Sequence, residues 1–169
     1  MRTLAVLTAT VILAACSPPA QQSIQAEWDM GPMPPVAALY DRAAPPTTAD
    51  ERNYYFTRDL AAALSAPDTP VDFDYRSWAN DPEIERQTFG LSETPPEDRA
   101  VVVTRFTYPG IGDGMIVSYT LCRRGPSDWK IEDVSGQPVP QNPNEPASTE
   151  AVPSLREMLG LPTTSPSCD

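Results

Sequence analysis

The spacing of apolar residues in the first half of the chain predicts helices. A short helix is expected to begin with Pro35 in its first turn, with Val36, Leu39 and Tyr40 on one side. A second helical pattern places four apolar residues at i, i+4, i+7 and i+8, namely Phe56, Leu60, Ala63 and Leu64. Thr48 and Glu51 have capping-box spacing, and Thr57 is a second possible cap, so this helix begins near 49 or near 58. Pro67 ends it in either case.

The second half alternates with a period of two, as half-buried strands do. A strand is expected around residues 87–91, and a central three-strand meander follows it. The strands of the meander span residues 99–106, 115–122 and 129–134, and the turns between them span 109–114 and 125–128. A meander of this kind needs a helical layer on one face to form a core. The pattern therefore favours one α+β domain with helices on an antiparallel sheet.

Residues 136–149 are polar and rich in proline, so a loop is expected there. A last short helix follows, because Ser154 and Glu157 have capping-box spacing and Leu155, Met158 and Leu159 form an apolar stripe. The predicted divisions are a leader at 1–15, a tether at 16–33, the domain at 34–162 and a tail at 163–169.

The first residues have the pattern of an export signal. Arg2 supplies one positive charge, and residues 4–13 form an apolar run of about ten residues, too short to cross a bilayer. Leu13-Ala14-Ala15-Cys16 follows and resembles the lipobox of bacterial lipoproteins. The resemblance implies a diacylglycerol thioether on Cys16, which becomes the acylated first residue after cleavage. The alternative is an ordinary secretory signal with a chance cysteine.

Lipidation would hold the protein permanently in a bilayer, because stable anchoring takes two or more acyl chains. Ser17 follows the cysteine, where aspartate would suggest retention in the inner membrane. By this resemblance we expect an outer-membrane anchor, in a Gram-negative cell, with the domain facing the periplasm.

Composition narrows the possible activities. The formal net charge is −11, and it becomes −12 after loss of 1–15, whose only charged residue is Arg2. A chain with this much negative charge is repelled by the phosphates of nucleic acid, so nucleic acid is not expected as a partner. Histidine is absent, which excludes histidine-dependent triads and His-containing zinc sites. No cofactor is expected.

Two cysteines remain after Cys16, namely Cys122 and Cys168. In an oxidising compartment two thiols most often pair, which here would tie the proline-rich tail to the domain. The alternative is a Cys168 that is free or bonded to another chain.

The order of helices, an Asp-Phe-Asp segment at 72–74 and a meander resembles the α+β cone of the nuclear-transport-factor-like, or cystatin-like, fold. Segments 56–60, 72–74, 101–106, 129–134 and 154–159 are similar to secreted bacterial proteins of unknown function with this fold. The resemblance implies a curved sheet that encloses a pocket with the helices. It says little about chemistry, since such cones include enzymes, binding proteins and scaffolds.

By analogy with such cones, five polar or aromatic residues are expected near the pocket: Asp74, Trp78, Arg105, Tyr119 and Trp129. A carboxylate buried among aromatics can act as an acid or base. The alternative is that Asp74 caps a turn or pairs with an arginine such as Arg105, with the aromatics in the core.

Other candidate motifs are weak. The glycines at 110–114 lack the lysine and the following helix of a phosphate loop, so a hairpin turn is expected there. A calcium site at Glu93, Glu97 and Asp98 is an alternative that EF-hand spacing does not support. No metal site is therefore expected. Ser118 and Ser127 have no histidine, and no motif pairs either with Lys130.

The sequence thus favours a non-catalytic lipoprotein domain that binds a small molecule or an envelope protein. The alternatives are a small lyase-, isomerase- or hydrolase-like enzyme that uses Asp74, and a structural or assembly role in the envelope.

Overall fold

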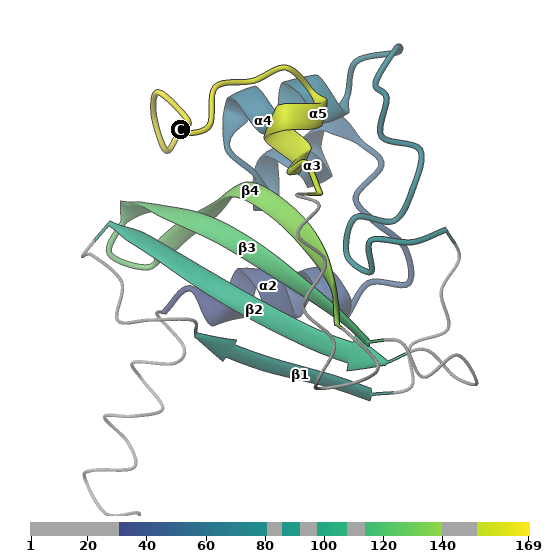
Figure 1. Cartoon of the computed structure of the whole chain (residues 1–169). Coiled ribbons are helices and arrows are strands. Elements are labelled where there is room, and N and C mark those ends of the chain that lie inside the picture. Colours follow the sequence, from purple (N-terminus) through teal and green to yellow (C-terminus); the bar gives the residue numbers. More distant parts are fainter. Residues whose placement is uncertain (1–30, 81–85, 92–97, 108–113, 140–151) are drawn as a thin grey trace, which may run out of the picture.

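The structure of the chain, a computed structural model, describes residues 31–80, 86–91, 98–107, 114–139 and 152–169. Its centre is one antiparallel sheet of four strands in the order β1-β2-β3-β4, shown in Figure 1. The strands are β1 (Arg86–Leu91), β2 (Arg99–Thr107), β3 (Gly114–Gly125) and β4 (Asp128–Val139). Each strand pairs with the next in sequence. The predicted α+β class with an antiparallel meander is confirmed, and the strand expected around 87–91 is its first strand.

The last strand is longer than the sequence pattern indicated. β4 continues to Val139, through residues that were expected to form a loop. Gly136 lies opposite Val117 in the register and is buried beneath the Trp78 ring. Because Trp78 comes from a distant segment and provides the apolar cover, β4 needs no large side chain at Gly136. The alternation that marks a strand is therefore absent from this part of the sequence.

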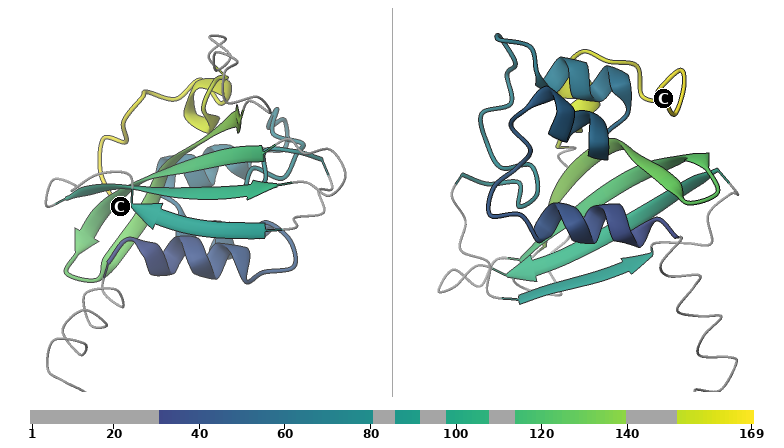
Figure 2. Two further views of the ribbon diagram at one scale, coloured as in Figure 1. Left: turned by 60° about the horizontal axis from the view of Figure 1, so that its bottom comes forward. Right: turned by 180° about the vertical axis from the view of Figure 1, so that it is seen from behind.

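Helix α2 (Met33–Tyr40) covers one face of the sheet, as the views in Figure 2 show. Val36 and Leu39 of α2 are fully buried. The matching face of the sheet carries the alternate strand residues that are buried in the core, among them Val102, Phe106, Val117, Tyr119 and Val134. The opposite face of β1, β2 and β3 is not covered by any helix of the described chain (Figures 1 and 2).

The remaining helices gather at the β4 side of the sheet (Figure 1). They are α3 (Ala49–Tyr55), α4 (Arg58–Leu64) and α5 (Leu155–Met158). Both capping boxes predicted from sequence are formed, at Thr48 with Glu51 and at Ser154 with Glu157. Both alternative helix starts are used, because Phe56 and Thr57 leave the helical conformation between α3 and α4. Phe56 there forms a bridge to Ile131 of β4.

The end of the chain returns to the sheet. Cys122 of β3 and Cys168 form a disulfide, with Cα atoms 5.7 Å apart, and this is the intramolecular pairing favoured by sequence. The Arg58 amide donates a hydrogen bond to the Asp169 carbonyl, and Ser165 is buried. Residues 163–169 therefore pack against α4 and the sheet.

Candidate functional site

The five predicted pocket residues lie in three places. Asp74, Trp78 and Tyr119 are on the α2 side of the sheet, where Tyr119 is fully buried. Arg105 is exposed on the opposite face, because its neighbours along β2 point into the core. Trp129 lies at the start of β4, where it lines a hollow of about 240 Å³ together with Pro34 of α2.

Asp74 is held by an arginine, but by Arg76 and not by Arg105. The Arg76 guanidinium donates from Nη2 to Asp74 Oδ2 over 2.6 Å and from Nε to Oδ1 over 3.0 Å. The Arg76 amide also donates to Oδ1, over 2.9 Å, so that Asp74 caps a turn. Arg76 Nη1 donates to the Arg42 carbonyl over 2.7 Å, just beyond α2. Asp74 therefore positions Arg76 against the end of α2.

Two tyrosines form a hydrogen-bonded pair beside this turn. The Tyr119 hydroxyl donates to the Tyr40 hydroxyl over 2.8 Å, and Tyr40 donates to the Arg76 carbonyl. Burial raises the pKa of Tyr40 to about 12, and it raises the pKa of Tyr119 well above its ordinary value. Both phenols are therefore protonated at neutral pH and act as donors that join α2 to the sheet.

Trp78 occupies a tight position over β4. Its φ of 57° lies in the left-handed region that a bulky residue rarely adopts. A Cβ atom on Gly136 would lie only 2.1 Å from Trp78 Cγ. The indole thus needs a glycine beneath it.

We therefore expect Gly136→Ala to lower the free energy of unfolding by about 1–3 kcal/mol, the usual cost of overpacking a core. Urea unfolding followed by tryptophan fluorescence would measure this loss. Gly90→Ala is the matched control, because a Cβ atom on Gly90 would meet no atom within 4 Å. Equal stability of the two variants would contradict the tight contact.

A groove with a volume of about 520 Å³ lies on the sheet face opposite α2. All four strands contribute to its lining, which consists of Thr88, Phe89, Gly90, Leu91, Val103, Arg105, Ile116, Ser118 and Gln137. Of the predicted pocket residues it contains only Arg105.

The strand register places seven of the nine groove residues in two rows. Thr88, Arg105, Ile116 and Gln137 are successive partners across the four strands. Gly90, Val103 and Ser118 are successive partners in the next row. The groove therefore combines one guanidinium, two hydroxyls and one amide with apolar side chains.

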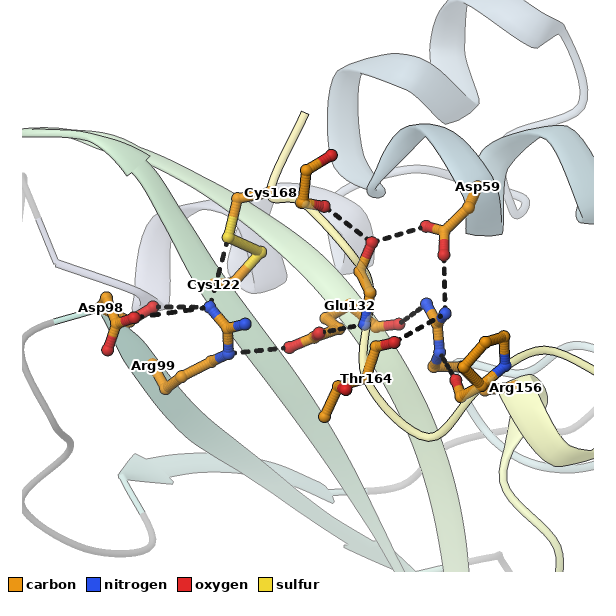
Figure 3. Close-up of polar contacts among 11 residues, drawn as sticks. Asp59, Asp98, Arg99, Cys122, Glu132, Arg156, Thr164 and Cys168 are labelled. Atoms are coloured by element: carbon orange, nitrogen blue, oxygen red, sulfur yellow. Dashed lines mark hydrogen bonds and ion pairs between the residues drawn. A yellow bond between two sulfur atoms is a disulfide. The ribbon is translucent and has the colours of Figure 1, made fainter.

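A second polar cluster, buried between α4, α5, β4 and the C-terminal residues, centres on Arg156 (Figure 3). The Arg156 side chain has 0% exposure. Its Nη2 atom lies 2.6 Å from Asp59 Oδ2, and Nη1 donates to the Glu132 carbonyl over 3.2 Å. The same guanidinium donates to the carbonyls of Pro162 and Thr164. Arg156 thus binds the chain end to the helices and the sheet.

Glu132 extends this cluster toward the disulfide. Its side chain is 1% exposed, accepts a hydrogen bond from the Ser165 amide and lies 3.2 Å from Arg99 Nε. Arg99 Nη1 is 3.4 Å from Cys168 Sγ, and this contact is one of the dashed lines in Figure 3. The buried side chains of Arg156 and Glu132, together with the disulfide, therefore hold residues 162–168 against the helices and the sheet.

Burial alone would raise the pKa of Asp59, but the hydrogen bonds that it accepts, with Arg156 first among them, lower it to about 2. Asp59 is therefore ionised over the whole physiological range, as is suited to a structural ion pair.

Sequence patterns did not single out Arg156 or Glu132. Arg156 lies in a capped helix of one turn, where an arginine in the last turn is ordinary. One signal in the sequence could have identified Glu132. It lies beside apolar residues of a predicted strand, and a carboxylate that is buried in such a strand needs a partner.

The glycines expected to form a turn at 110–114 lie mostly outside the described residues, as do Glu93 and Glu97. Within the described part of the chain, no three histidine, cysteine or acidic residues come close enough to hold a metal ion. The described helices include none that is long and apolar enough to cross a membrane.

Comparison of the chain with protein-family models, with curated proteins and with solved structures found no match.

Proposed function

We propose that this chain is a lipid-anchored protein of the bacterial cell envelope whose α+β domain binds a ligand without converting it. The observation that carries the binding function is the groove opposite α2. Its described lining offers a guanidinium, hydroxyls and an amide, but no carboxylate, thiol or phenol. These groups orient and hold a ligand, whereas acid–base chemistry needs a group that titrates near neutral pH.

The enzyme alternative has less support. Asp74 is the carboxylate that it would use, and both oxygens of Asp74 accept hydrogen bonds from Arg76. Asp74 therefore serves to position Arg76, and it lines neither the groove opposite α2 nor the hollow beside Trp129.

The fold family proposed here is the nuclear-transport-factor-like cone. The order of helices before an antiparallel meander supports it, together with the covering of one sheet face by α2. The groove lies on the other face of the sheet, so the proposed binding site differs from the enclosed pocket that the resemblance implies.

The proposed anchor rests on Leu13-Ala14-Ala15-Cys16 after a short apolar run. Cys16 would carry the lipid, and Ser17 favours sorting to the outer membrane, with the domain in the periplasm. The disulfide between Cys122 and Cys168 is consistent with an oxidising compartment.

We expect Cys16→Ser to abolish the incorporation of labelled fatty acid and to leave the precursor uncleaved, because the thiol is the atom that accepts diacylglycerol. Metabolic labelling and membrane fractionation would measure both effects. Ser17→Ala is the control and should be lipidated normally. Normal processing and membrane retention of Cys16→Ser would contradict the anchor.

Native mass spectrometry tests the binding function. The mature chain, exported to a periplasm and purified gently, is expected to carry an extra mass that is lost on denaturation. If every growth condition gave only the mass of the bare chain, and no small molecule restored a shift, the binding function would be wrong and a structural role would replace it.

A further inference from the structure

We propose that the groove binds a free amphiphilic anion, with the acid group on Arg105 and the apolar body over Val103 and Ile116. This inference rests on the proposed binding function and adds to it the class of the ligand and the way in which it lies.

The charge of Arg105 is the first observation. Most other described cations have a partner: Arg42 pairs with Glu51, Arg76 with Asp74, Arg99 with Glu132, Arg124 with Asp128 and Arg156 with Asp59. Among the described residues, Arg105 has no hydrogen bond or ion pair, although the chain has a net charge of −11. An exposed guanidinium in a groove is suited to a carboxylate or phosphate, which it can bind with two parallel hydrogen bonds.

The neighbours of Arg105 provide the second observation. Thr88 is its direct partner on β1, close enough for the hydroxyl to donate to the same acid group. Ile116 is its direct partner on β3, and Val103 lies two residues back along β2 on the same face. A cation beside an apolar floor matches a molecule with an acid group at one end and a hydrocarbon body.

Gly90 makes room for that body. It is the partner of Val103 on β1 and lines the groove, and a Cβ atom there would meet nothing within 4 Å. A side chain at this position would enter the groove without disturbing the core.

The size of the groove and the charge of the chain favour a free molecule over a lipid within a bilayer. A volume of about 520 Å³ is in the usual range for small-molecule sites. The net charge of −11 is repelled by the many charges of an anionic membrane surface much more strongly than by the single charge of a free anion. The ligand is therefore expected to come from solution.

Photolabelling of the full-length lipoprotein in phosphatidylcholine nanodiscs tests the inference. The probe is dodecanoate that carries a diazirine, and the matched alcohol with the same chain is the neutral comparison. We expect the acid to label peptides that contain Val103 or Ile116. Excess decanoate should compete with the probe and reduce this labelling. The alcohol should label the same peptides less, by about tenfold or more, because it cannot form the charge-assisted hydrogen bond to Arg105.

Four variants separate charge from shape. Arg105→Gln should weaken labelling by the acid about tenfold or more, whereas Arg105→Lys should keep most of it. Gly90→Phe should block labelling by filling the groove. Arg58→Gln, which removes an exposed arginine of α4, is the matched control and should label like the parent protein. An unchanged thermal unfolding midpoint would show that each variant is folded.

The outcomes distinguish this inference from the function on which it rests. Equal labelling by acid and alcohol, labelling outside the groove, or indifference to Arg105→Gln would overturn the anionic ligand but leave binding intact. Competition by phosphatidylglycerol in the nanodiscs, without competition by decanoate, would overturn the free ligand in favour of a membrane lipid. Failure of both probes, together with only the bare-chain mass in native spectra, would overturn the binding function itself.

Discussion

Arg156→Ala is expected to lower the free energy of unfolding by about 3–5 kcal/mol, the cost of removing one partner of a buried ion pair. The substitution leaves Asp59 without its cation and the Glu132, Pro162 and Thr164 carbonyls without their donor. Urea unfolding at constant pH would measure the loss. Arg156→Lys should recover only part of it, because an ammonium cannot reach all of these acceptors in one plane.

Arg58→Ala is the control for this prediction, since Arg58 is an exposed arginine near the same cluster. Its expected effect is within about 0.5 kcal/mol. If Arg156→Ala cost no more than Arg58→Ala, the buried cluster would not stabilise the fold.

Acid provides a second check on the same ion pair. The pKa of Asp59 is lowered from 3.8 to about 2 in the folded state, so its contribution is complete above about pH 4 and is lost as pH falls through 2. The difference in stability between the parent and Arg156→Ala should therefore shrink over that acid range. A difference that stayed constant down to pH 2 would assign the loss to packing and not to charge.

Loss of the disulfide is the second large effect. Cys122→Ser, Cys168→Ser and the double variant are each expected to lower the free energy of unfolding by about 4 kcal/mol, because the bridge closes a loop with a sequence separation of 46. Urea unfolding under non-reducing conditions would measure it. Equality of the single and double variants is the internal control, since all three lack the same bond.

Reduction of the parent protein should reproduce the loss. Because the bridge ties Cys168 to β3, its loss should raise amide hydrogen exchange first in residues 163–169. Unchanged exchange there, together with a loss under about 1 kcal/mol, would mean that the polar cluster holds the segment without the bridge.

The order and type of most elements could be predicted from the sequence, because they depend on local patterns. Helical spacing, the capping boxes at Thr48 and Ser154, and the period of two in β2 and β3 are all properties of neighbouring residues. The pairing of Cys122 with Cys168 was favoured by a count of thiols, and the structure contains it.

The location of the candidate site could not be predicted from such patterns. The resemblance to a cone predicts that Arg105 lies in one pocket with Asp74 and Tyr119. Alternation along β2 shows only that Arg105 is on the face opposite Thr104 and Phe106, and it does not show which of the two faces the helices cover. Which face the helices cover is decided by how α2 packs, and that depends on the whole core. The partner of Asp74 was likewise found two residues away, at Arg76, and not across the sheet.

The sequence by itself determined the local features: the Leu13-Ala14-Ala15-Cys16 motif, the absence of histidine, the acidic charge and the succession of helices and strands. Only the tertiary structure decided which polar residues are buried and which are exposed to solvent. Arg156 and Glu132 are buried because their partners arrive from Asp59, Arg99 and residues 162–165, far apart in the chain. Arg105 is exposed because no described element covers its side of the sheet. Local patterns contain no information about such distant partners, since burial of a charge depends on what the fold brings next to it.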